Sequence, residues 1–177
     1  MKSSELWEIK TGARQQKDIS DNESVSYGTH AEEHIRQLFM LKHPELTLEY
    51  HPYMFLFQSE NPWLRSTLDG ELIDSDGRRG ILEIKSASCS KKSDWEKWNG
   101  HIPDYYFCQI VHQFLSTGFD FAYLSAELIA PNLDSEIRNY YFEWDDVKDS
   151  ATYLFDEEQR FMNSVKTGKI PTTTLRL

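Results

Sequence analysis

Two acidic residues and one lysine stand on either side of a tight turn. Asp69 precedes the turn at residues 74–77, and Glu83 and Lys85 follow it. If the turn centres near residue 76, antiparallel pairing places Asp69 beside Glu83, and Lys85 projects from the same strand face as Glu83. Two carboxylates that face each other across a strand pair repel, so a divalent cation would be needed to hold them together. The pattern therefore predicts metal-assisted hydrolysis, in which a cation activates water and neutralises a phosphate.

The alternative is an ordinary hairpin whose charged face is solvated. For one Asp and one Glu-x-Lys string this is the more frequent case, because short motifs match by chance. The neighbouring segments change that balance. A helix is expected over residues 27–42 and carries Glu32, and a helix expected over residues 103–118 carries Gln109. Both helices flank the hairpin in sequence and can bring further polar side chains to it.

Two adjacent glutamates compete for the position on the first of these helices. Glu32 lies three residues before Ile35 and seven before Phe39, at the edge of the apolar face, whereas Glu33 aligns with the polar side. We therefore choose Glu32. The alternative for Glu32 is a surface pair with Arg36, one turn further along the helix.

The apolar periodicity predicts an α+β fold in which a central mixed sheet is flanked by helices. Strands are expected over residues 49–57, 64–73, 80–86, 119–130 and 138–144. Further helices are expected over residues 6–12 and from Asp145, which could cap the last one. We expect a mobile loop over residues 14–26 and a frayed tail over residues 168–177.

The composition indicates one folded domain over residues 1–177, since 14% of the residues are aromatic and no low-complexity tract interrupts the pattern. No run is long and apolar enough for a membrane helix, and the first residues do not resemble a signal peptide. We expect a cytoplasmic protein with no membrane partner.

The net charge of −10 argues against a protein that coats nucleic acid by bulk attraction. Any contact with DNA must depend on local groups of basic residues. The candidates are Arg78, Arg79, Lys91 and Lys92. Carboxylates gathered to hold metal would also make a nuclease acidic, so the sign of the charge does not exclude one.

Four strings carry a resemblance to a known family. They are Tyr27-Gly28-Thr29-His30-Ala31-Glu32, Ser66-Thr67-Leu68-Asp69-Gly70, Leu82-Glu83-Ile84-Lys85 and Tyr106-Phe107-Cys108-Gln109-Ile110-Val111-His112-Gln113. In this order they resemble the YqaJ-like viral recombinase family, which is lambda-exonuclease-like and belongs to the PD-(D/E)xK nuclease superfamily. The usual Pro before the first acid is replaced by Leu68. The resemblance covers most of the chain, from Leu6 to the last expected helix.

The resemblance implies a restriction-endonuclease-like core and a 5′-to-3′ exonuclease acting on double-stranded DNA. It also implies Mg²⁺, with Mn²⁺ as a substitute and two ions in the site, a trimeric ring, and a single-strand annealing protein as partner. The roles carried over by position are metal ligation by Asp69, Glu83 and the Ile84 carbonyl, support of the metal-water shell by Glu32, and catalysis by Lys85 and Gln109.

Each role has an alternative. Lys85 could form a salt bridge without a catalytic role, and Gln109 could be a buried amide that only makes hydrogen bonds. The whole chain could be an endonuclease on the same fold, or a DNA-binding or assembly module without activity. The family's grip on a terminal 5′-phosphate has no match here, Arg14 included, so we expect a weak preference for phosphorylated 5′ ends.

Overall fold

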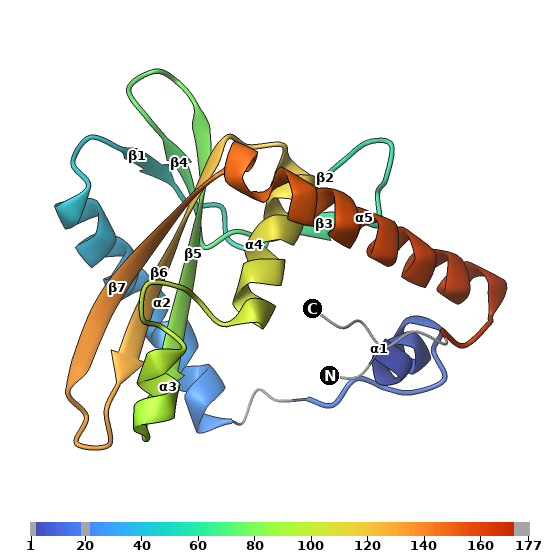
Figure 1. Cartoon of the computed structure of the whole chain (residues 1–177), viewed down its shortest axis with the longest axis horizontal. Coiled ribbons are helices and arrows are strands. Elements are labelled where there is room, and N and C mark those ends of the chain that lie inside the picture. The colour runs from blue at the N-terminus through green and yellow to red at the C-terminus, as the bar shows by residue number, and fades with distance from the viewer. Residues whose placement is uncertain (1–2, 19–21, 172–177) are drawn as a thin grey trace.

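The computed structural model describes residues 3–18 and 22–171. Its helices are α1 (Ser3–Lys10), α2 (Glu23–Lys42), α3 (Lys92–Glu96), α4 (Asp104–Thr117) and α5 (Trp144–Thr167). Its strands are β1 (Thr47–Glu49), β2 (Leu56–Phe57), β3 (Arg65–Ser66), β4 (Gly70–Ile73), β5 (Arg79–Ser88), β6 (Phe121–Ile129) and β7 (Ser135–Glu143). A five-stranded mixed sheet has the order β1-β4-β5-β6-β7, with α2 on one side and α4 and α5 on the other (Figure 1). This arrangement confirms the expected α+β class with helices on both faces of a mixed sheet.

The hairpin β4–β5 has the register that the turn predicts. Gly70 lies opposite Leu82 and Leu72 lies opposite Gly80. Gly77 adopts a φ of 79°, in the left-handed region that glycine tolerates best, and its N–H donates to the Asp74 carbonyl at 3.0 Å. β5 then pairs in parallel with β6, so the chain must cross from one end of the sheet to the other through α3 and α4.

β5 lies at the centre of the sheet and both of its faces are covered. Leu82 and Ile84 pack against α2, in a cluster that includes Ile35 and Phe39. Ile81 points to the opposite face and packs in the cluster formed with α4 and α5. Because successive strand residues alternate between faces, residues 83 and 85 fall on the side of α4.

Two predicted strands are broken in the structure. Instead of a strand over 49–57, β1 ends at Glu49 and β2 spans only Leu56–Phe57. Pro52 lacks a backbone donor for a ladder, and Tyr53 adopts a left-handed φ of 64°, so the extended chain is interrupted. The strand predicted over 64–73 divides because β3 pairs with β2 in a separate sheet, whereas β4 pairs with β1 and β5.

The helix boundaries also differ from the prediction. α2 begins at Glu23, within the predicted loop, because the Asn22 side chain accepts a hydrogen bond from the Ser24 N–H at 2.9 Å and caps the helix. Residues 19–21 of that loop lie outside the described residues, as does the tail from residue 172. α5 follows an N-cap at Glu143, before the expected Asp145, and α3 was not predicted.

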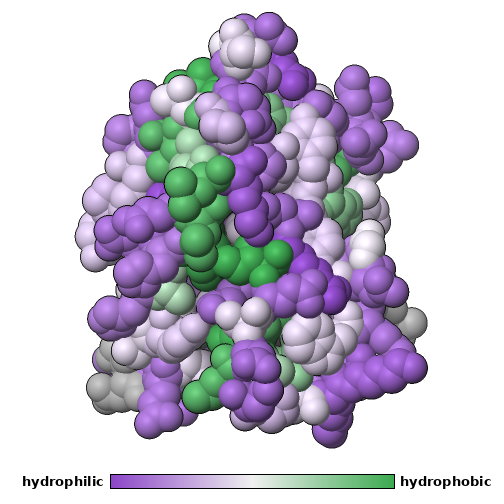
Figure 2. All heavy atoms as spheres, turned by 90° about the vertical axis from the view of Figure 1, so that its left-hand side faces the viewer, coloured by the Kyte–Doolittle hydropathy of each residue, from purple (hydrophilic) through white to green (hydrophobic). Residues whose placement is uncertain are grey.

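The outer side of α2 carries more apolar surface than its periodicity predicts. Leu38 and Leu41 are exposed, whereas Arg36 is buried. Figure 2 views the molecule from the left-hand side of Figure 1 and shows a narrow stripe of hydrophobic side chains on a largely hydrophilic face. No helix in residues 3–18 and 22–171 has the length and apolar content needed to span a bilayer.

The close approach of β5 and β6 generates a stability prediction. A Cβ at Gly80 would lie 2.2 Å from Cε2 of the buried Phe121 ring, so Gly80→Ala should destabilise the fold by about 1–3 kcal/mol. Gly28 in α2 has open space around the same position, so Gly28→Ala should be neutral or stabilise by up to about 1 kcal/mol. Urea unfolding measures both, and equal stability of the two variants would contradict this packing.

Candidate active site

Glu83 is a buried carboxylate held by three donors. It is 2% exposed, beneath α4. Gln109 Nε2 donates to Glu83 Oε1 at 2.6 Å, and Gln113 Nε2 donates to Oε2 at 2.5 Å. The Lys85 ammonium also contacts Oε1, as expected for the same face of β5. A solvated hairpin face is therefore excluded for Glu83, because α4 covers it.

Asp69 lies at the open edge of β5, just before β4 begins. Its Oδ2 accepts a hydrogen bond from the Ile84 N–H at 2.7 Å, and its backbone carbonyl accepts one from Arg36 Nε at 2.7 Å. The N–H and C=O of one strand residue point to the same side of the strand, so the Ile84 carbonyl faces this edge as well. The structure thus brings Asp69, Glu83 and Ile84 to one end of the hairpin.

The two glutamates of α2 differ as the helix periodicity predicts. Glu32 is half-buried, and its pKa is raised by burial and then by the charge of Asp69. Glu33 is exposed and accepts a hydrogen bond from Gln37 at 3.4 Å. Arg36 is close enough to lower the pKa of Glu32, but its guanidinium donates to the Asp69 backbone.

The electrostatics of the two central carboxylates indicate a shortage of positive charge. Burial, and after it the charge of Asp69, raise the pKa of Glu83 to about 7, although Lys85 and Gln113 act to lower it. Burial also raises the pKa of Asp69, against the hydrogen bond from Ile84 and the charge of Lys85, which lower it. A bound cation would favour the ionised form of both groups.

Sequence reasoning missed two residues of this site. Gln113 is buried and donates a hydrogen bond to the Glu83 carboxylate, as Gln109 does from one helical turn earlier. The spacing of four residues could have revealed it. The Tyr106 ring lies 5.4 Å from Lys85 Nζ, a cation–π contact that covers the ammonium. No sequence pattern distinguishes Tyr106 from the other aromatic residues of α4.

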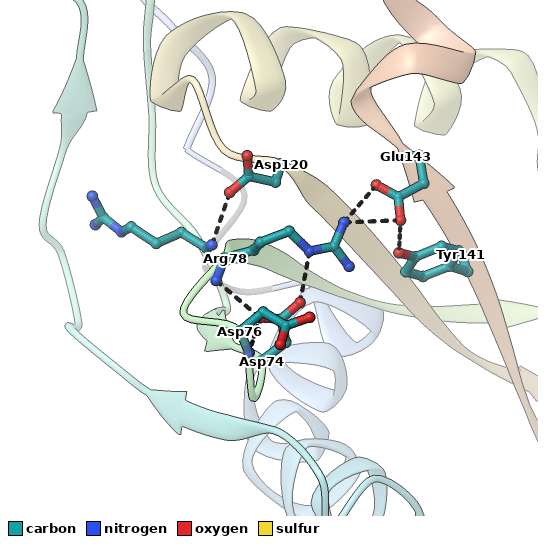
Figure 3. Close-up of polar contacts among 7 residues, drawn as sticks. Asp74, Asp76, Arg78, Asp120, Tyr141 and Glu143 are labelled. Atoms are coloured by element: carbon teal, nitrogen blue, oxygen red, sulfur yellow. Dashed lines mark hydrogen bonds and ion pairs between the residues drawn. The ribbon is translucent and has the colours of Figure 1, made fainter.

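The predicted DNA-binding residues do not come together. Arg78 lies in the β4–β5 turn, where its guanidinium donates to Asp74 at 2.8 Å and to Glu143 at 3.2 Å (Figure 3). Arg79 Nε donates to Glu71 at 2.6 Å. These carboxylates offset much of the positive charge that a phosphate would need.

The two candidate lysines lie beyond the opposite end of β5. Lys91 precedes α3, and Lys92 is its first residue, with an ammonium 3.8 Å from Glu96. Arg14 lies near α1, where it pairs with Glu5 and Glu8 at 2.9 Å each.

Within the described residues, no group of three or more Asp, Glu, His or Cys side chains is close enough to hold a metal ion.

Comparisons with known proteins identify both family and fold. Residues 1–120 match the family model of the YqaJ-like viral recombinase domain. The crystal structure of an alkaline exonuclease (LHK-Exo) from Laribacter hongkongensis superimposes with a TM-score of 0.59 at 12% identity, covering 93% of this chain and 80% of that one. LHK-Exo in complex with dAMP gives a TM-score of 0.57 at 17% identity, covering 94% and 78%. No curated protein sequence matches. The likeness confirms the restriction-endonuclease-like fold.

The raised pKa of Glu83 predicts a pH-dependent stability in the absence of metal. Its pKa is about 7 in the folded protein against 4.5 in the unfolded chain, so the folded state binds the proton more tightly. The resulting contribution, up to about 3 kcal/mol, is fully present below pH 4.5 and is lost as the pH rises through 7. The midpoint temperature of unfolding, measured in chelator, should therefore fall more steeply between pH 5.5 and 8.5 for wild type than for Glu83→Gln. Parallel curves would contradict the prediction.

Proposed function

Because this chain belongs to the YqaJ-like viral recombinase domain family, we propose that it is a metal-dependent exonuclease that hydrolyses linear double-stranded DNA in phage-type recombination. The observation that carries the proposal is the buried Glu83 carboxylate, held by Lys85, Gln109 and Gln113 beside Asp69. The similar solved structures are named as alkaline exonucleases, which supports the same reaction class.

The residues present fit a divalent cation. Burial raises the pKa of both Asp69 and Glu83, and the charge of Asp69 adds to the shift of Glu83, so a cation would stabilise both ionised groups. Both carboxylates offer hard oxygen atoms, which Mg²⁺ and Mn²⁺ prefer over the softer ligands of zinc. Mg²⁺ is commonly bound by one or two carboxylates, with water completing its shell. Asp69, Glu83 and the Ile84 carbonyl would hold it, with Glu32 supporting the water shell. When bound, one or two such ions supply Lewis-acid activation of water and charge neutralisation of the phosphate.

The protein's own groups would position and neutralise the reactants. The Lys85 ammonium can leave Glu83 and donate to the attacking water or a phosphate oxygen, since its side chain has three donors on a flexible stem. Gln109 and Gln113 would keep the Glu83 carboxylate fixed while Lys85 moves. The Tyr106 ring would keep the Lys85 ammonium close to Glu83 and Asp69.

We further propose that the protein works as a closed trimer and digests from 5′ to 3′, with a single-strand annealing protein as partner. A subunit of net charge −10 can hold duplex DNA only where its basic residues are concentrated, and a ring directs several copies inward. Static light scattering that gives a monomer at the concentration of the nuclease assay would contradict the ring.

The proposed metal site predicts the effect of five substitutions. Asp69→Asn and Glu83→Gln should each lower magnesium-dependent hydrolysis by more than about 100-fold, and Glu32→Gln by about 10- to 100-fold. Glu33→Gln is the matched control, because Glu33 is exposed on the same helix, and it should be unaffected. Lys85→Ala should lower turnover far more than metal affinity, which calorimetry measures. Normal turnover with lost metal binding in Lys85→Ala would reverse its assigned role.

The substrate proposal is tested with labelled duplexes. Linear DNA carrying a label at either the 5′ or the 3′ end, and closed circular DNA, are incubated with and without magnesium. We expect early release of the 5′ label as mononucleotide from linear DNA and no cleavage of the circle. Cleavage of the circle would instead indicate an endonuclease on the same fold, and no cleavage of any DNA would leave a binding or assembly module.

A further inference from the structure

The chain from the end of β1 through β2 exposes an unusual number of large apolar side chains. The aromatic segment, residues 50–57, presents Tyr50, Tyr53, Met54, Phe55 and Phe57 to solvent. Tyr53 is 94% exposed. No residue of the segment is acidic, although the chain as a whole has a net charge of −10. A contiguous exposed group of this kind marks an interaction site more often than a solvated surface.

The backbone of the segment presents the Tyr53 ring at a conformational cost. Tyr53 has a φ of 64°, which is uncommon for a bulky residue, and the Met54 N–H closes the turn by donating to the His51 carbonyl at 3.2 Å. Because the ring is almost fully exposed, packing within this chain does not account for the conformation. Backbone strain of this kind is concentrated at functional sites.

The aromatic segment is joined directly to Asp69. The Arg36 guanidinium stacks over the Tyr50 ring at 3.8 Å, and its Nε holds the Asp69 carbonyl. Met54 lines a small recess that also includes Leu68 and Gly70, the residues on either side of Asp69. A strand whose phosphodiester lies at Asp69 would therefore pass the segment.

The positive charge near the segment differs from that elsewhere in the chain. Arg78 and Arg79 are paired with carboxylates, whereas neither Arg36 nor Arg65 forms an ion pair with a carboxylate among the described residues. Arg65 instead lies 5.2 Å from the Phe55 ring. Rings that present their faces, together with arginines, are the combination by which proteins bind single nucleic-acid strands without reading their sequence.

We propose that the aromatic segment is a base-stacking surface that holds the nucleotides adjoining the scissile phosphodiester. The proposal rests on the nuclease function proposed above. It adds that the aromatic segment contacts the faces of the substrate's bases. The ring of Tyr53 stacks on one base, Phe55 extends the surface, and Arg36 links their position to Asp69.

The test separates stacking from phosphate binding. Labelled single-stranded dT oligonucleotide and an abasic strand of equal length are bound in EDTA and followed by fluorescence anisotropy. Wild type should prefer the dT strand, and Tyr53→Gly with Phe55→Ala should lose about tenfold or more in affinity for dT but little for the abasic strand. Glycine adopts the positive φ at position 53 freely, so the ring is removed without strain. Tyr53→Phe should keep the preference.

Leu133 provides the matched control, because it is exposed and also has a positive φ, of 66°, in the β6–β7 connection. Leu133→Gly should bind both strands as wild type does. Equal affinity of wild type for the dT and abasic strands overturns the proposal, as does a changed oligomer mass in the double variant, which would make the segment a subunit contact. Absence of nuclease activity in wild type would overturn the function alone, because binding in EDTA still reports stacking.

Discussion

The structure around the candidate site depends on one buried carboxylate. Glu83 lies in the central strand, where both faces of the sheet are covered, and an ionised group there requires compensation. Gln109, Gln113 and Lys85 supply hydrogen bonds and charge, so the orientation of α4 over β5 is tied to this group. The negative charge of Asp69, just before β4, disfavours the ionised form of Glu83, so these donors do not fully compensate the buried carboxylate. The proposed cation site follows from this remaining need for positive charge.

The sheet explains why these groups meet. The hairpin turn sets the register of β4 and β5. Because β4 begins only at Gly70, the Ile84 N–H of β5 is free to donate to the Asp69 side chain instead of a ladder partner. α2 contributes from the opposite face, through Arg36 at the Asp69 backbone and Glu32 near its carboxylate. The site thus lies at the edge where both layers of helices reach the hairpin.

Acidic side chains pair with the arginines at the turn end of the hairpin, which leaves little free positive charge there for DNA. Arg78 and Arg79 are largely balanced by the carboxylates Asp74, Glu143 and Glu71, so the charge of the hairpin end is local and paired. Aromatic faces near Asp69 can attract a strand without net positive charge, because stacking depends on contact area and not on counterion release. This would allow a strongly acidic chain to hold nucleic acid close to its carboxylates.

The sequence by itself determined the hairpin register and the shared face of Glu83 and Lys85, because turn chemistry and the period of two are local properties. It also distinguished Glu32 from Glu33 by helical period, and its four strings indicated the family. Only the tertiary structure decided that Glu83 is buried, that Gln113 joins Gln109, and that the strands predicted over 49–57 and 64–73 break. Burial and strand pairing depend on segments distant in sequence, such as α4 over β5 and β3 beside β2, whose contacts no local pattern encodes.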